Sequence, residues 1–556
     1  MGRWHVRCDR TRVRQRLTLI FIFLIVGLVG FHNSFQAPFV FDDVRGVLEN
    51  DNIRTLWPPW VPFHGTSRPL VQFSLALNYA VCGFSVWSYH VLNLLIHVAA
   101  ALTLFATIRL TLRKYGEDPL RNASDGLALA VALCWMVHPL QTESVTYVIQ
   151  RGEAMMGLFC LLMLLCFIVS IGSPRQTCWL LCSLLCCVLG LMTKPVMLMA
   201  PVLILMYDRT FIARSFAAAL RLRWRYYSAL LAVMALLPLI LNGNKGDWAT
   251  SVGSEVTGIS PLQYAASQPG IILHYLHLTF WPDALCLDYG LRPEENRWVI
   301  LGCSLVIGLL LVLTIWALKR RNAAGFAGAW FFLTLAPTSS FVPIADLAFE
   351  HRMYLALASV LAVALPSGYF LLNKVLDYLP LFQRHKRLIL GGSTLLVGAL
   401  LAGRTILRND DYSSEIAIWT SATEVSPRSA RAQYNLGTAL SRKQRAAEAI
   451  DHLIKAVQIR SSYPEAYYNL GNTLYTLGRW PEAILSYRRA LTLTPNDWQM
   501  HNNLGVAMLK SGDESSAEIE FHKTLRLNPG CSSAQRNLAK LQQTPQVIPT
   551  VAGSLH

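Results

Sequence analysis

Long apolar runs dominate the first four hundred residues of this 556-residue chain. A helix needs about 20 mostly apolar residues to cross a bilayer core, and runs of roughly 17–22 recur before residue 405. Charged residues make up 15% of the chain, against about a quarter in soluble proteins. We therefore predict eleven membrane spans, near 17–35, 89–110, 125–139, 153–172, 176–192, 195–207, 226–242, 299–318, 325–342, 353–372 and 387–404.

The basic residues indicate an orientation. In a soluble chain the net charge of +16 would suggest nucleic-acid binding. Here the Arg and Lys residues collect at the N-terminus and after every second span, as in cytoplasmic loops, so no nucleic-acid partner is expected. An odd number of spans then places the C-terminal region outside the cytoplasm. The interpretation is a multi-pass protein of the bacterial inner membrane with a periplasmic C-terminal region; the alternative is the endoplasmic reticulum with that region lumenal.

After residue 410 the sequence repeats with a period of 34 residues. Asn-Leu-Gly begins at Asn435, Asn469 and Asn503, and Ala449, Ala483 and Ala517 keep the same phase. This pattern is typical of tetratricopeptide repeats, in which small residues let two helices approach and a bulky residue fills the seam. The prediction is an all-α chain: a membrane domain at 1–408, a repeat domain at 409–543 and a disordered tail at 544–556.

Polar residues gather at the ends of the apolar runs, on the predicted outer side. Asp42 and Asp43 follow the first run, and charged residues near a bilayer are costly unless they pair, face water or act in chemistry. The others are Arg68, His138, Glu143, Arg151, Glu153, Lys194, Asp288, Tyr289, Glu350, His351, Arg352 and Tyr354. Cations can hold a phosphate and stabilise it as a leaving group, and a carboxylate can accept a hydroxyl proton as general base.

The same residues carry a family resemblance. Phe41-Asp42-Asp43, Arg68-Pro69-Leu70, His138-Pro139, Asp288-Tyr289 and Glu350-His351-Arg352 occur in order and precede the repeats. Together they resemble the transmembrane and tetratricopeptide-repeat O-mannosyltransferases and their bacterial relatives, over nearly the whole chain. Two positions depart from that pattern: Lys194-Pro195 stands where relatives often have Lys-Glu, and Arg151-Gly152-Glu153 replaces a more usual Arg-Ala-Asp.

The resemblance implies a GT-C glycosyltransferase. Such an enzyme would move a sugar, such as mannose, from a polyprenyl-phosphate carrier to Ser or Thr of a protein, with inversion at the anomeric carbon. Asp42 or Asp43 would be the catalytic acid-base residue, and the remaining polar residues would bind substrate. The donor lipid lies in the membrane, and the repeats would bind the acceptor polypeptide.

Other interpretations remain open at this point. The acid pair could cap a loop, the arginines could form structural ion pairs, and Lys194 could be an interfacial anchor. His274 and His277 are spaced for one helix face, but no third ligand is evident, so no metal cofactor is expected. A non-catalytic scaffold that organises an envelope complex is the alternative function, and a lipid-linked sugar transporter is a third.

Overall fold

The computed structural model describes residues 10–63, 65–235 and 258–543. These residues form helices joined by turns and loops, with no β-strand among them, which confirms the all-α prediction. The chain divides into two units. The first consists of residues 1–287 and 291–417, and the second of residues 288–290 and 418–556. Each is described by itself below.

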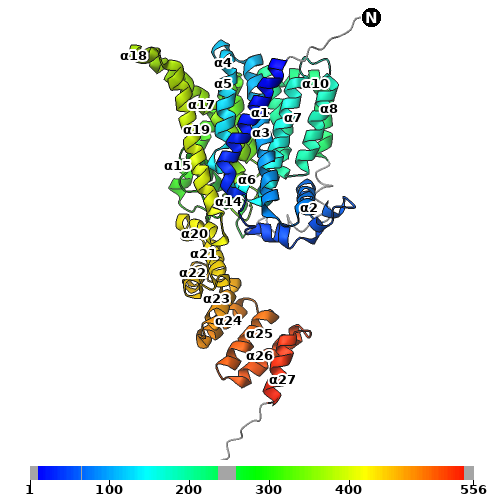
Figure 1. Ribbon diagram of the computed structural model, residues 1–556, viewed down its shortest axis with the longest axis vertical. Helices are drawn as coiled ribbons and strands as arrows, with labels where there is room; N and C mark the ends of the chain where they lie inside the picture. The colour runs from blue at the N-terminus through cyan, green and yellow to red at the C-terminus, as the bar shows by residue number, and fades with distance from the viewer. Residues whose placement is uncertain (1–9, 64, 236–257, 544–556) are drawn as a thin grey trace, which may run out of the picture. The chain divides into compact units, whose positions relative to one another are not determined.

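The first unit is a bundle of apolar helices (Figure 1). Its helices are α1 (Arg10–Phe31), α2 (Pro69–Cys82), α3 (Val86–Tyr115), α4 (Asp118–Asn122), α5 (Ser124–Met136), α6 (Thr142–Thr146), α7 (Arg151–Ser170), α8 (Gln176–Leu191), α9 (Ala200–Tyr207), α10 (Phe216–Met234), α14 (Pro261–Phe280), α15 (Arg297–Lys319), α16 (Ala323–Leu335), α17 (Met353–Asp377), α18 (Pro380–Gln383) and α19 (Lys386–Asp411). A helix lies at each predicted span.

Within the described residues, 7 helices are long and apolar enough to cross a membrane. Four shorter apolar helices accompany them: α2, α5, α8 and α16. Eleven crossings therefore remain a prediction. The predicted span at 226–242 is represented by α10, which begins ten residues earlier, at Phe216, and the end of that span lies outside the described residues.

Burial separates the helices at the centre of the bundle from those at its surface. The apolar stretch around α7 is 72% buried, whereas that of α15 is 6% buried and that of α19 is 11% buried. Helix α7 packs against α3 and α8, and α3 packs against α5. Helices with so much exposed apolar surface are stable only in an apolar surrounding such as lipid.

The second unit is a solenoid of paired helices. Its helices are the part of α20 (Glu415–Val425) from Ile418 onwards, then α21 (Ala430–Arg442), α22 (Ala446–Ile459), α23 (Pro464–Thr476), α24 (Trp480–Leu493), α25 (Trp498–Lys510), α26 (Glu514–Leu527) and α27 (Ser532–Gln543). The predicted tail at 544–556 lies outside the described residues.

Close approach of the paired helices explains the repeated glycine. A Cβ atom placed on Gly471 would lie 2.6 Å from the Tyr487 ring, and one on Gly505 would lie 2.8 Å from the Phe521 ring. Any side chain at these positions would collide with the bulky residue of the partner helix. The sequence period of 34 therefore reflects one seam repeated along the solenoid.

Candidate active site

Asp42 and Asp43 are adjacent in sequence but lie in different environments. Asp43 is 1% exposed and accepts two backbone hydrogen bonds, from Ile149 N to Oδ1 at 2.7 Å and from Val40 N to Oδ2 at 3.2 Å. Asp42 is exposed. Asp43 therefore holds the loop after α1 against the segment before α7, and Asp42 is the acid that a substrate can reach.

Burial changes the protonation of Asp43. It raises the pKa of this carboxyl to about 8, against the opposing effect of the hydrogen bonds from Ile149 and Val40. A protonated neighbour carries no charge, so near neutral pH Asp42 does not face a second anion beside it. The pair thus divides two tasks between a structural acid and an accessible one.

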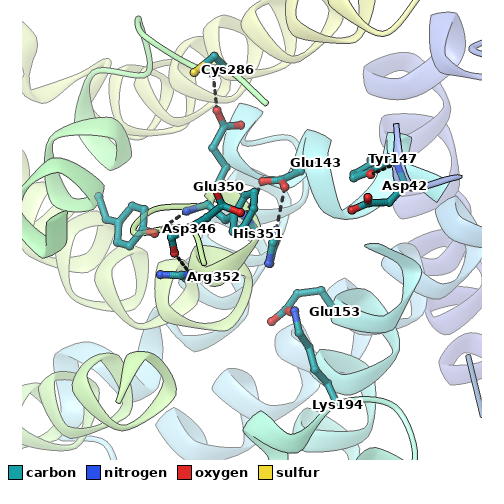
Figure 2. Close-up of polar contacts among 12 residues, drawn as sticks. Asp42, Glu143, Tyr147, Glu153, Lys194, Cys286, Asp346, Glu350, His351 and Arg352 are labelled. Carbon is teal, nitrogen blue, oxygen red and sulfur yellow. Dashed lines mark hydrogen bonds and ion pairs between the residues drawn. The ribbon is translucent and has the colours of Figure 1, made fainter. Parts of the chain in front are cut away.

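The backbone around Asp42 is constrained on both sides. Phe41, the residue before it, has φ of 49°, in the left-handed region that non-glycine residues seldom adopt. The Asp42 amide donates a hydrogen bond of 2.9 Å to the Tyr147 hydroxyl oxygen, and Figure 2 shows these two residues together. Such strain is retained where the surrounding contacts fix one conformation, and it is concentrated at functional sites.

A second group of acids lies near the start of α17. Glu143 accepts two hydrogen bonds from His351, from the backbone N to Oε2 and from Nδ1–H to Oε1, both at 2.8 Å (Figure 2). Glu350 accepts a hydrogen bond of 2.6 Å from Cys286 N and lies 3.5 Å from Arg408 Nη2. Burial raises the pKa of Glu143, while the His351 amide and the Arg408 and Lys194 charges oppose that rise.

Lys194 and Glu153 form a nearly buried ion pair between the turn after α8 and the first turn of α7 (Figure 2). Burial lowers the pKa of Lys194, the Glu153 carboxylate opposes this, and the Arg68 and Arg352 charges lower it further. His351 is also within electrostatic range of Lys194, Glu153, Arg352 and Arg68. Cations from α2, the turn before residue 195 and α17 therefore share one region of the first unit.

Arg151 uses its donors on the protein itself. Its guanidinium donates to Asn93 Oδ1 at 2.5 Å, Asn78 Oδ1 at 2.7 Å and the Tyr89 carbonyl at 3.1 Å, and the side chain is fully buried. A cation at a helix N-terminus opposes the helix dipole, so these acceptors offset an unfavourable position. The contacts favour a structural role that joins α2, α3 and α7.

Arg352 and Arg68 differ from each other in the same way. Arg352 donates to the backbone carbonyls of Leu347 at 2.8 Å and Asp346 at 2.7 Å, so it fixes the loop before α17. Arg68 is half-buried, immediately before α2. Among the described residues, no hydrogen bond or ion pair engages its guanidinium. Of the predicted cations, Arg68 is the one best placed to receive an anionic ligand.

His138 and Tyr354 are bonded within the bundle. His138 Nδ1 accepts from Leu140 N at 3.2 Å, and its Nε2–H donates to the Thr279 carbonyl at 3.0 Å. The Tyr354 hydroxyl bonds His97 Nδ1 at 2.9 Å, and its carbonyl accepts from Trp135 Nε1 at 2.8 Å. Both residues are buried, and these contacts indicate that they position the cluster rather than contact substrate.

Asp288 and Tyr289 belong to the second unit. Asp288 accepts from Arg431 Nη2 at 2.7 Å and from the Ser429 hydroxyl at 2.8 Å, and the Tyr289 carbonyl accepts from the Ser426 hydroxyl. Burial alone would raise the pKa of Asp288, but the Arg431 hydrogen bonds and charge lower it overall. The structure does not bring these two residues together with the acids and cations of the first unit.

Arg408 and Asn409 were absent from the predicted set, although they lie in it. Arg408 is 4% exposed, pairs with Asp411 at 2.7 Å and lies beside Glu350. Asn409 accepts from the Thr146 hydroxyl at 2.7 Å and donates to the Gly30 carbonyl at 3.0 Å, so it connects α19, α6 and α1. The available signal was a cation and an amide in the last turn of an apolar helix, followed directly by two acids.

The first unit thus contains an accessible carboxylate, an Arg without a protein partner and several ordered acids and cations at the same ends of its helices. Within the described residues, no group of three or more His, Cys, Asp and Glu side chains is arranged to hold a metal ion. Such a set suits acid–base and phosphate chemistry at a membrane surface.

Sequence comparisons agree with this class of a membrane-embedded unit followed by helical repeats. Two tetratricopeptide-repeat family models match residues 428–496 and 468–530, which confirms the predicted repeats. A solved structure titled as a TPR protein with an unusual peptide-binding site, YrrB, is 21% identical, covers 31% of this chain and 90% of its own, and has a TM-score of 0.22. That likeness is too low to support an argument.

Full-length relatives give a more specific result. A protein O-mannosyl-transferase of Caenorhabditis elegans is 24% identical over 81% of this chain and 64% of its own length. The human protein O-mannosyl-transferase TMTC4 is 23% identical over 76% of this chain and 64% of its own. The chain is a homologue of these tetratricopeptide-repeat O-mannosyl-transferases, and it spans about three fifths of the length of the curated relatives it matches.

Proposed function

We propose that this chain is a membrane protein O-glycosyltransferase of the GT-C class. It would transfer a hexose such as mannose from a polyprenyl-phosphate carrier to Ser or Thr of an acceptor polypeptide. The single observation that carries the proposal is the division between buried Asp43 and exposed Asp42, in the same unit as Arg68 and Lys194. The names of the relatives support the reaction class.

In the proposed mechanism Asp42 is the general base. Its carboxylate accepts the proton of the acceptor hydroxyl while the hydroxyl oxygen attacks the anomeric carbon. The bond from that carbon to the phosphate oxygen breaks, and the lipid phosphate leaves with its negative charge. Attack on the face opposite the leaving group inverts the configuration at the anomeric carbon.

Arg68 would bind the phosphate and stabilise it as it leaves. A guanidinium can bind two phosphate oxygens at once, and charge-assisted hydrogen bonds are stronger than neutral ones. Lys194, Arg352 and His351 support this role because they lie within electrostatic range of one another. Lys194 is neutralised by Glu153 and Arg352 is bound to carbonyls, so they shape the potential, and Arg68 makes the contact.

The repeats would bind the acceptor polypeptide. Stacked helical pairs present extended surfaces that bind peptides, and their number and spacing are established here by the family models. Under the proposal, both the repeats and the Asp42 region lie outside the cytoplasm. The basic Lys319–Arg321 and Arg384–Arg387 segments would then face the cytoplasm.

Transfer by purified full-length protein tests the proposal directly. The donor would be polyprenyl-phosphate-mannose, with a nucleotide-sugar as the comparison donor, and the readout would be the hexose mass added to a Ser- and Thr-containing peptide. We expect Asp42→Asn to reduce transfer by about 10²–10⁴-fold, the usual contribution of a general base. Asp42→Glu is the control that retains a carboxylate.

Two results would oppose the proposal. Wild-type transfer from the nucleotide-sugar alone would exclude the lipid-linked donor. Full transfer by Asp42→Asn protein would exclude Asp42 as the base, and absence of transfer by every form, with the repeats still binding peptide, would favour the non-catalytic scaffold.

A further inference from the structure

A large apolar cavity lies in the first unit, in the half of the bundle opposite the acids. Its volume is about 510 Å³, within the range of about 300–1,000 Å³ that is typical of ligand sites. It is lined by Leu104, Ile108, Leu161, Phe211, Trp330 and Phe370, among other residues. Such a volume exceeds a packing defect, which in native interiors is seldom larger than a water molecule.

Its place along three helices separates it from the candidate active site. Helix α7 begins at Arg151 and Glu153, whereas the cavity contacts Leu161 and Leu164 further along it. Helix α17 begins at Met353, directly after Arg352, and contributes Ala358 to Phe370 to the lining. The cavity therefore lies in the other half of the membrane thickness from the acids.

The cavity is open towards the surrounding lipid. Val363 lines it and is 37% exposed. Pro366 stands inside α17 and also lines the cavity. A proline within a helix removes a backbone hydrogen bond and bends the helix, so α17 departs from regular packing at this opening.

Positive charge stands beside the end of the cavity formed by α16. Asn322, Ala323 and Ala324 line the cavity at the N-terminus of this helix. Immediately before them come Lys319, Arg320 and Arg321, of which Arg320 and Arg321 are exposed. Within the described parts of the chain, none of these three side chains has a carboxylate partner.

We propose that this cavity binds one acyl chain of an anionic phospholipid, whose phosphate lies against Lys319–Arg321 and the N-terminus of α16. An apolar cavity of this size accommodates a hydrocarbon chain, and a phosphate is favoured by both the basic side chains and the positive end of a helix dipole. Glu117 also lines the cavity, from the loop before α4, so the headgroup lies on the α16 side, away from that acid. The bound lipid is a permanent part of the bundle, distinct from the donor lipid of the proposed reaction.

Native mass spectrometry of full-length protein in mild detergent tests this assignment. We expect one tightly held phospholipid per chain, with phosphatidylglycerol retained over phosphatidylcholine. Ala362→Trp, which fills the cavity, should abolish that retention, and Ala399→Phe on the exposed face of α19 is the matched control. Arg320→Gln with Arg321→Gln should remove the preference for an anionic headgroup, whereas Arg384→Gln with Arg387→Gln should preserve it.

A wild-type measurement covers the case in which a variant does not fold. A phospholipid with a photoreactive group in its acyl chain should crosslink to peptides from residues 104–112 of α3 and 358–370 of α17. Crosslinks confined to the exposed surfaces of α15 and α19 would overturn the proposal. So would recovery of polyprenyl phosphate as the retained lipid, or equal lipid retention in folded Ala362→Trp protein.

Discussion

The Lys194 ammonium and the Glu153 carboxylate form an ion pair in which the two side chains are 11% and 4% exposed. The pair joins the turn after α8 to the first turn of α7. Two buried charges are expensive to separate, because the partner left behind remains without compensation. This relationship leads to a prediction about which variants of the pair the fold tolerates.

Lys194→Met should destabilise the protein by about 3–5 kcal/mol, the usual cost of leaving one buried charge unpaired. The double variant Lys194→Met with Glu153→Gln removes both charges and should recover most of that loss. The measurement is thermal unfolding of the detergent-solubilised protein. Exposed Arg445 and Glu448 form a matched surface pair, and Arg445→Met should change the unfolding temperature little. Equal stability of the single and double variants at position 194 would contradict the buried-pair argument.

Arg68 and Arg151 should respond to substitution in opposite ways. Arg68→Gln should raise the KM for the lipid-linked donor by about 10- to 100-fold, since a hydrogen bond to a charged group contributes about 1.5–3 kcal/mol. The unfolding temperature should not change, because no described residue depends on this guanidinium.

Arg151→Gln should lower the unfolding temperature, because Asn78, Asn93 and the Tyr89 carbonyl lose their donor. Its effect on donor KM should follow from misfolding alone and disappear at a temperature where the variant is folded. A KM effect for Arg151→Gln in fully folded protein, with none for Arg68→Gln, would exchange the two assignments.

The sequence was sufficient for the features that depend on local pattern. Apolar run length predicted the membrane helices, and the period of 34 predicted the paired helices, including the glycine that lies against Tyr487 or Phe521. Both signals depend on residues that are near neighbours in sequence or recur at a fixed distance.

Pairing in space was not predictable in the same way. Glu350 lies beside Arg408, 58 positions later, and Arg151 is bonded by Asn78 and Asn93 of two other helices. A list of cations cannot show which of them a protein acceptor already occupies. The same limit left Asp42 and Asp43 equivalent until burial separated them.

Stability should depend on pH through Asp43. Its pKa in the folded protein is about 8, against an ordinary value of 3.8. Between these values the folded state holds a proton that the unfolded state has released, so rising pH favours unfolding. The contribution of this group should therefore fall from pH 4 to pH 8 and be constant above that.

Thermal unfolding across that pH range would test the sign. Asp43→Asn protein cannot titrate at this position, so its unfolding temperature should fall less steeply with pH than that of the wild type. Asp42→Asn is the matched control, because it changes the neighbouring exposed carboxylate. A steeper fall for Asp43→Asn, or identical slopes for all three proteins, would show that Asp43 is ionised in the folded state.

Gly471→Ala should destabilise the repeats by about 1–3 kcal/mol, the usual cost of overpacking. The added methyl would lie 2.6 Å from the Tyr487 ring, which cannot withdraw because it is almost fully buried and its hydroxyl donates to Asn472 Oδ1 at 2.7 Å. Limited proteolysis of the full-length protein, followed by mass spectrometry of the fragments, should show faster cleavage within residues 464–493. Gly398→Ala in α19 meets no atom within 4 Å and should leave the cleavage pattern unchanged. Because helix propensity favours Ala over Gly at both positions, slower cleavage of Gly471→Ala would mean that the seam can open to admit a methyl group.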